Sequence, residues 1–122
     1  MTGVLRAIRG ATTLDEDSAE QIYERTQALV RAILERNELS QDDLVSILFT
    51  ATTDIHAAFP ATAARALGLD EVPLIGAQEM EVPGALARCV RVLVHCYTER
   101  SRKELEHVYL EGATVLRRDL VR

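Results

Sequence analysis

The sequence lacks the features that would mark a membrane, secreted or nucleic-acid-binding protein. No apolar stretch is long enough to span a bilayer, and the N-terminus does not have the basic, apolar and small-residue order of a signal peptide. Positive charge is in the minority: 14 Lys and Arg stand against 19 Asp and Glu, for a net charge of -5. Nucleic acid or an anionic membrane would favour a basic face. We therefore expect a cytoplasmic protein with neither of them as its main partner.

Cysteine is scarce, and the two that occur favour neither a disulfide nor a metal site. Cys89 and Cys96 are seven residues apart on one expected strand, so their side chains would lie on opposite faces, too far apart to bridge. Zinc binding through His95 and Cys96 is disfavoured, because neighbouring strand residues point in opposite directions and no CxxC spacing occurs. We expect two buried free thiols.

The spacing of apolar residues predicts one domain, residues 1–122, with about five strands and one long helix. The long helix opens at an acidic capping box formed by Asp17 and Glu20 and ends near residue 37, and a short helix covers 60–67. The expected extended segments are 4–11, 44–51, 72–77, 86–98, 108–110 and 114–116. Together these elements indicate an α+β or mixed α/β fold.

The helices are too few to cover the whole sheet. One helix of about 20 residues buries only one face of a five-stranded sheet, through an apolar stripe at helical spacing. That stripe consists of Ile22, Thr26, Leu29, Val30, Ile33 and Leu34. The other face of the sheet is apolar as well, so we expect it to be buried against other copies of the chain.

An arginine inside an apolar run is the main candidate for a binding residue, since no Ser-His-Asp arrangement, phosphate-binding Gly-rich loop or nucleotide fingerprint occurs. Arg91 lies in the Val- and Leu-rich run 87–97, which we expect to be mostly buried. A buried guanidinium requires a partner, and the run contains no acid. The partner is either a distant carboxylate or an anion outside the chain. Arg9 lies in a second apolar segment, residues 3–13, at the end of its apolar part. Two arginines on adjacent strands would bind carboxylates.

Short motifs spread over nearly the whole chain carry a resemblance to a known family. They are residues 8–13 (IRGATT), 53–61 (TDIHAAFPA), 72–73 (VP), 78–80 (QEM), 88–92 (RCVRV), 107–111 (HVYLE) and 115–120 (VLRRDL). Their order is similar to that of the monofunctional, trimeric chorismate mutases of the AroH class. The resemblance implies a five-stranded mixed sheet with one long helix and short helical turns, assembled as a trimeric pseudo-α/β barrel with sites between adjacent subunits.

The resemblance also implies a reaction: the rearrangement of chorismate to prephenate, which leads to phenylalanine and tyrosine. The substrate is a dicarboxylate with an enol-pyruvyl ether and a ring hydroxyl. A pericyclic bond exchange requires no nucleophile, proton transfer, metal or cofactor. The protein must hold a compact substrate conformer and stabilise the negative charge that grows on the breaking ether oxygen.

Three charged residues and a tyrosine would carry this chemistry. Arg91 would donate to the ether oxygen and to a substrate carboxylate, Glu79 would accept from the ring hydroxyl, and Arg9 with Tyr109 would bind the side-chain carboxylate. Each has an ordinary alternative when the resemblance is set aside. Arg91 could be paired with a remote acid, and Glu79 could be a solvated loop carboxylate. Arg9 could be a surface charge, and Tyr109 a half-buried tyrosine of the sheet.

Further residues would complete the pocket, most of them from a neighbouring subunit. Those expected from the neighbour are Phe59, Ala61, Arg65, Leu74 and Ile75, although Phe59 and Leu74 taken alone read as core residues. Leu116 and Arg117, with Asp119 beyond, resemble a tail over the entrance. Two positions depart from the family pattern: Gly76 stands where a cysteine beside the ring hydroxyl is common, and Thr62 where a lysine is.

Two other functions remain as alternatives. One is a regulatory module that binds a carboxylate without chemistry, and the other is a trimeric enamine deaminase of similar architecture. The segments 78–80 and 107–109 do not suit the deaminase. Loss of the ultraviolet absorbance of added chorismate would separate all three functions.

Overall fold

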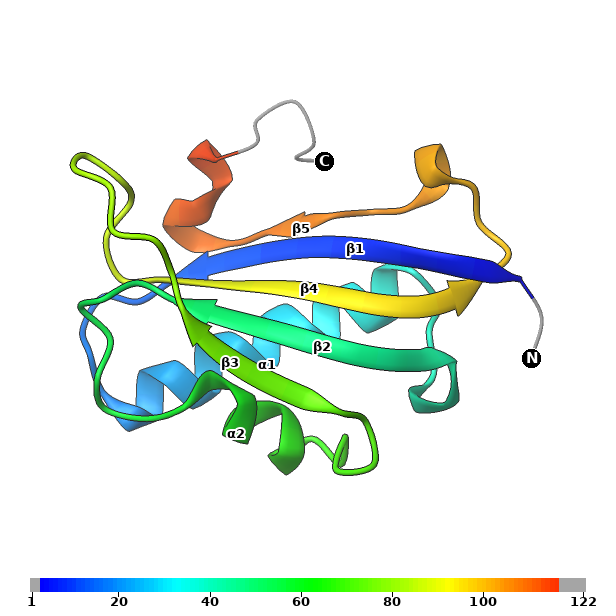
Figure 1. Cartoon of the computed structure of the whole chain (residues 1–122), viewed down its shortest axis with the longest axis horizontal. Helices are drawn as coiled ribbons and strands as arrows, with labels where there is room; N and C mark the ends of the chain where they lie inside the picture. Colours follow the sequence, from blue (N-terminus) through cyan, green and yellow to red (C-terminus); the bar gives the residue numbers. More distant parts are fainter. Residues whose placement is uncertain (1–2, 117–122) are drawn as a thin grey trace.

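The computed structural model describes residues 3–116, which form one sheet with two α helices packed on it (Figure 1). Three 3-10 turns complete the structure, at Gln41–Asp43, Arg102–Glu104 and Glu111–Val115. In chain order the helices and strands are β1 (Val4–Thr13), α1 (Ala19–Arg36), β2 (Leu44–Ala51), α2 (Pro60–Ala66), β3 (Leu74–Gln78), β4 (Cys89–Thr98) and β5 (Val108–Tyr109). No helix of the described segment is long and apolar enough to cross a membrane.

The sheet is mixed, with strand order β3-β2-β4-β1-β5. The central strand β4 pairs antiparallel with both β1 and β2, whereas the outer strands β3 and β5 pair parallel with their neighbours. Strands that are consecutive in the chain are therefore mostly not neighbours in the sheet. The expectation of a five-stranded mixed α+β fold is confirmed.

Both helices pack on the same face of the sheet, as Figure 1 shows. The core combines α1 residues such as Leu29 and Ile33 with alternate strand residues such as Ile8, Phe49 and Val94. Five of the six positions expected on the apolar stripe of α1 are fully buried, and Leu34 is half-buried. The period of 3.6 residues was therefore a sound guide to this layer.

The start of α1 differs from the expected acidic capping box. Ser18 is the N-cap, and its hydroxyl accepts a hydrogen bond from the Gln21 N–H at 3.2 Å. The Asp17 carboxylate instead accepts from the N–H groups of His56 and Ala57 at 2.9–3.0 Å. Asp17 thus fixes the loop before α2, and a serine has the capping role that serine commonly fills.

The C-terminal part of the described chain also differs. The segment 114–116, expected to be extended, lies in and beside the 3-10 turn Glu111–Val115. Glu111 adopts a left-handed conformation with φ 52, and the Gly112 N–H donates to the Thr13 hydroxyl at 2.9 Å. These interactions turn the chain back over β1, so β5 ends at Tyr109.

The other face of the sheet is open in this chain. It carries apolar side chains that are well exposed, with 53% of Leu5, 39% of Leu48 and 63% of Ile75 accessible to solvent. The run 87–97, expected to be mostly buried, is buried on its helix side and, on the other face, at Cys89. Its odd-numbered residues 91 to 97 are exposed or half-buried on the open face, because side chains alternate along a strand.

Candidate active site

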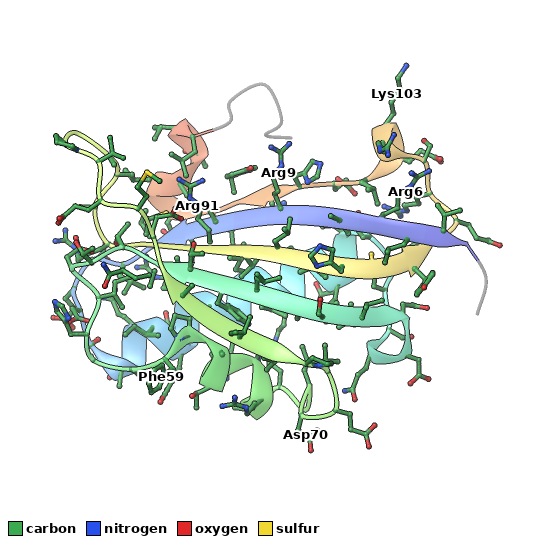
Figure 2. All side chains as sticks on the ribbon, in the orientation of Figure 1. Arg6, Arg9, Phe59, Asp70, Arg91 and Lys103 are labelled. Atoms are coloured by element: carbon green, nitrogen blue, oxygen red, sulfur yellow. The ribbon has the colours of Figure 1, made fainter. Side chains whose placement is uncertain are left out.

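Arg9 and Arg91 lie on the open face of adjacent strands, as the sequence predicted. In the β1–β4 register Arg91 pairs with Ala11 and Arg9 pairs with Leu93, so the two arginines are diagonal neighbours. Such neighbours are roughly 7–8 Å apart, which suits the binding of a small dianion. Figure 2 shows both side chains rising from the sheet on the side of β5.

The expectation that Arg91 is mostly buried is wrong. Its side chain is 54% exposed, and its Nε lies 3.2 Å from Oε2 of Glu79. The partner is therefore a distant carboxylate, one of the two possibilities that the sequence left open. Within residues 3–116 the guanidinium of Arg91 donates no hydrogen bond. Its N–H groups remain available to a ligand in the pocket that Arg91 lines.

Glu79 is held by three strands rather than solvated in a loop. It directly follows β3, and its N–H donates to the carbonyl of Ala51 on β2 at 2.9 Å. Its Oε2 accepts a hydrogen bond from the Thr50 hydroxyl at 2.8 Å and forms the ion pair with Arg91 Nε, and its side chain is 25% exposed. Thr50 was not among the candidates from the sequence. It pairs with Arg91 in the β2–β4 register, which the sequence alone does not reveal.

These residues surround a pocket of about 530 Å³. Arg9, Glu79, Arg91, Tyr109 and Leu116, all candidates from the sequence, line it together with Thr50. Two guanidinium groups and one carboxylate give the lining a net charge of +1, in a chain whose net charge is -5. A local cationic pocket of this size suits a small anion.

The wall beside Tyr109 is apolar and uncharged. Tyr109 is only 8% exposed and packs in a small cluster with Ala11, Cys89 and Ala113. Burial raises the pKa of the Cys89 thiol to about 11, although the Arg91 charge acts in the opposite direction. The thiol is therefore neutral near pH 7, and both cysteines are free and buried, as expected.

The residues expected from a neighbouring subunit lie apart from this pocket. Phe59 and Gly76 line a second cavity of about 640 Å³ at the α2 side of the sheet. Phe59 is 78% exposed, so reading it as a core residue was wrong (Figure 2). Ile75 and Arg65 are exposed, and Leu74 is half-buried against the core.

Ala61 is 6% exposed and packs in the core. Arg117 and Asp119 lie outside the described residues.

Comparison with known proteins identifies the family of this chain. The family model for chorismate mutase type I matches residues 5–120. The chain belongs to this family. Chorismate mutases AroH from Bacillus subtilis and Thermus thermophilus are each 44% identical over 118 residues, which cover 96% of this chain and 93% and 97% of the respective relatives. The solved structure of a Clostridium thermocellum chorismate mutase is 46% identical, with a TM-score of 0.89 over 90% of this chain and 98% of that one.

This membership makes the chain a chorismate mutase, which is an isomerase of the aromatic amino-acid pathway. Neither a purely regulatory module nor an enamine deaminase has support from these relatives. Chorismate as substrate follows from the family.

Proposed function

We propose that the chain converts chorismate to prephenate in the pocket lined by Arg9, Glu79, Arg91 and Tyr109. The observation that best supports this site is the geometry of Arg91. Its Nε lies 3.2 Å from Oε2 of Glu79, and this ion pair holds the guanidinium at the pocket that Arg91 lines. A donor that is held before the substrate arrives requires no reorganisation when negative charge develops on the breaking ether oxygen.

Arginine suits this role because its charge does not depend on pH. A guanidinium stays protonated in proteins and presents donors in a fixed plane. In the proposed site one edge of Arg91 faces Glu79, and the terminal nitrogens bind the ether oxygen and an adjacent substrate carboxylate. The pairing with Glu79 fixes the plane of the guanidinium and so the direction of these donors.

The remaining polar groups would bind the ends of the substrate. Arg9, two residues away along the open face on β1, would bind the side-chain carboxylate together with the Tyr109 hydroxyl. Glu79 uses Oε2 for Thr50 and Arg91, which leaves Oε1 for the ring hydroxyl. Holding both ends favours the compact conformer that the rearrangement requires.

We also propose that the site is completed by another copy of the chain in a homotrimer. The open face exposes a set of apolar residues, including Leu5, Leu48 and Ile75. Phe59 is 78% exposed although it is large and apolar, as expected of a residue that a neighbour covers. Phe59 and Ile75 come from the α2–β3 side, far along the sheet from β5. Leu74 and Gly76 would belong to the same contributed wall, with Arg65 at its margin.

The cytoplasm is the proposed location. Cys89 and Cys96 are both free and buried, which is usual where thiols are kept reduced.

The activity is tested by adding chorismate to the purified protein and following the loss of its ultraviolet absorbance, with prephenate identified as the product. We expect saturable turnover without added metal or cofactor. A protein that only binds the substrate would change its own fluorescence or melting temperature and leave the absorbance unchanged. That result would overturn the proposal.

The shared site is tested by mixing two inactive variants. Arg91→Ala and Arg65→Ala chains are unfolded together, refolded and assayed, beside each variant refolded alone. If one chain supplies Arg91 and its neighbour supplies Arg65, mixed trimers contain some sites with both arginines, and activity returns in part. No recovery in a mixture that forms trimers would show that the site lies within one chain.

A further inference from the structure

We infer that Thr50 is a positioning residue that orients Glu79 and, through Glu79, the guanidinium of Arg91. This inference rests on the proposed function. The Thr50 hydroxyl donates to Glu79 Oε2 at 2.8 Å, and the same oxygen lies 3.2 Å from Arg91 Nε. A side chain from each of two adjacent strands thus converges on one carboxylate oxygen, and Thr50 and Arg91 are themselves paired in the β2–β4 register.

The side chain of Glu79 requires a second partner, because its position just after β3 leaves the carboxylate free to rotate. It follows the last residue of β3, and only its N–H is fixed, by the carbonyl of Ala51. The terminal torsion of a glutamate is broad, and ordering the side chain costs conformational entropy. With Arg91 as its only partner, the carboxylate could rotate and exchange its oxygens. A second donor on Oε2 makes one orientation preferred.

The type of residue at position 50 fits this role. A threonine in a strand is restricted at its first side-chain torsion, so its hydroxyl is held in one direction. The hydroxyl is also neutral, so it binds the carboxylate without changing the balance of charge between Glu79 and Arg91. On the same face of β2 the neighbouring alternate position is Leu48, which has no donor. Thr50 is thus the β2 residue placed to fix which oxygen faces Arg91 and which faces the pocket.

The first test compares three side chains at position 50. Thr50→Val keeps the shape and removes the hydroxyl, and Thr50→Ser keeps the hydroxyl. Loss of one hydrogen bond to a charged group corresponds to about a tenfold change in rate. We expect the valine variant to lose about tenfold in kcat with a smaller change in KM, because the orientation of the Arg91 donors matters most in the transition state. The serine variant should regain most of that loss.

A matched control lies in the turn before β2. The Ser40 hydroxyl donates to Asp43 Oδ2 at 3.2 Å, a hydroxyl–carboxylate pair that lines neither the Arg91 pocket nor the second cavity. Ser40→Ala should leave kcat within about twofold of the wild type. Equal losses in Thr50→Val and Ser40→Ala would mean that the loss of any such hydrogen bond lowers activity, and the inference would be wrong.

A double-mutant cycle decides whether Thr50 acts through Glu79. In a Glu79→Ala background the hydroxyl has no carboxylate to orient, so adding Thr50→Val should reduce kcat by less than about twofold. If both losses multiply in full, Thr50 does not act through Glu79. Failure of the proposed function would look different. Either the wild-type protein would not convert chorismate, or Glu79→Ala and Arg91→Ala would keep wild-type activity whatever the variants at position 50 do. Circular dichroism of each variant checks that it is folded.

Discussion

Replacing Arg91 tests the physical core of the proposed mechanism. In Arg91→Ala the terminal nitrogens that face the pocket are lost, together with the Nε that lies 3.2 Å from Glu79. The side chain is 54% exposed, so its removal leaves no buried cavity comparable to that of a core truncation. The variant should therefore fold, and its rate should report on the site.

The expected magnitude has two parts. Loss of one preorganised donor to developing negative charge costs roughly 100- to 1,000-fold in kcat, or about 3–4 kcal/mol in the barrier. The lining also changes its charge: two guanidinium groups and one carboxylate give +1, and removal of Arg91 leaves Arg9 and Glu79, which give 0. A dicarboxylate substrate binds less well to a neutral pocket, so KM should rise as well.

The charge and the geometry can be separated with a second variant. Arg91→Lys keeps the net charge of +1 but replaces the planar fork with a single ammonium, which cannot bind Glu79 and the ether oxygen in the same way. We expect KM in the lysine variant to stay closer to the wild-type value, and kcat to fall nearly as far as in the alanine variant.

Steady-state assays of chorismate consumption measure both constants. Arg31→Ala is the control, since Arg31 is an exposed arginine of α1 on the helix side of the sheet. Its activity should equal that of the wild type. A folded Arg91→Ala variant with kcat within about threefold of the wild type would refute the role of this guanidinium.

Three other predictions concern pH, the buried thiol and the packing of α1. Because no proton moves in the proposed step, kcat should be nearly flat around pH 7 and unchanged in heavy water; a bell-shaped profile centred near neutrality would indicate acid–base catalysis instead. Burial raises the pKa of Cys89 from 9.0 to about 11, so a thiol reagent at pH 8 should label Cys89 only after unfolding. The free energy of unfolding should also decline as the pH rises from 9 towards 11, because the thiol ionises first in the unfolded chain. Rapid labelling of the native protein would contradict this prediction. In Gly10→Ala the added methyl would lie 2.8 Å from Ile33 Cδ1 and 3.1 Å from Leu29 Cδ1. This overpacking should lower the free energy of unfolding, measured by urea titration, by about 1–3 kcal/mol. An unchanged urea midpoint would mean that α1 shifts to accommodate the methyl group without cost.

Local patterns predicted the fold well where one element decides its own structure. The strand expected at 44–51 is β2 with the same bounds, because a short and mostly apolar run follows a capped turn. The start of α1 was harder, since Asp17 and Ser18 are both good caps. The choice depends on His56 and Ala57, 39 and 40 residues away, whose N–H groups bind Asp17. No local pattern contains that information.

The site shows the same division between local and distant information. Arg9, Glu79, Arg91 and Tyr109 were all candidates, and the structure brings them to one pocket. The burial of Arg91 was overestimated because Val and Leu crowd both sides of it in the sequence. Most of those Val and Leu residues face the helices, while Arg91 faces away from them. Thr50 was missed for a related reason: its significance depends on strand register with Arg91, and a lone threonine in a strand has no distinguishing signal.

The candidate residues fall into two separate groups, and this separation favours a heterologous contact between copies of the chain. Arg9 and Arg91 lie on the open face of β1 and β4, and Glu79 reaches Arg91 from the end of β3. Phe59 instead lines a cavity together with Tyr23 of α1, on the side of the sheet that carries the helices, so a rigid sheet does not bring it to Arg9 and Arg91 within one chain. A contact between unlike surfaces of two copies can do so, and it is heterologous, since each copy offers a different side. In the proposed trimer such a contact would repeat around a ring, and its closure would give every copy one completed pocket.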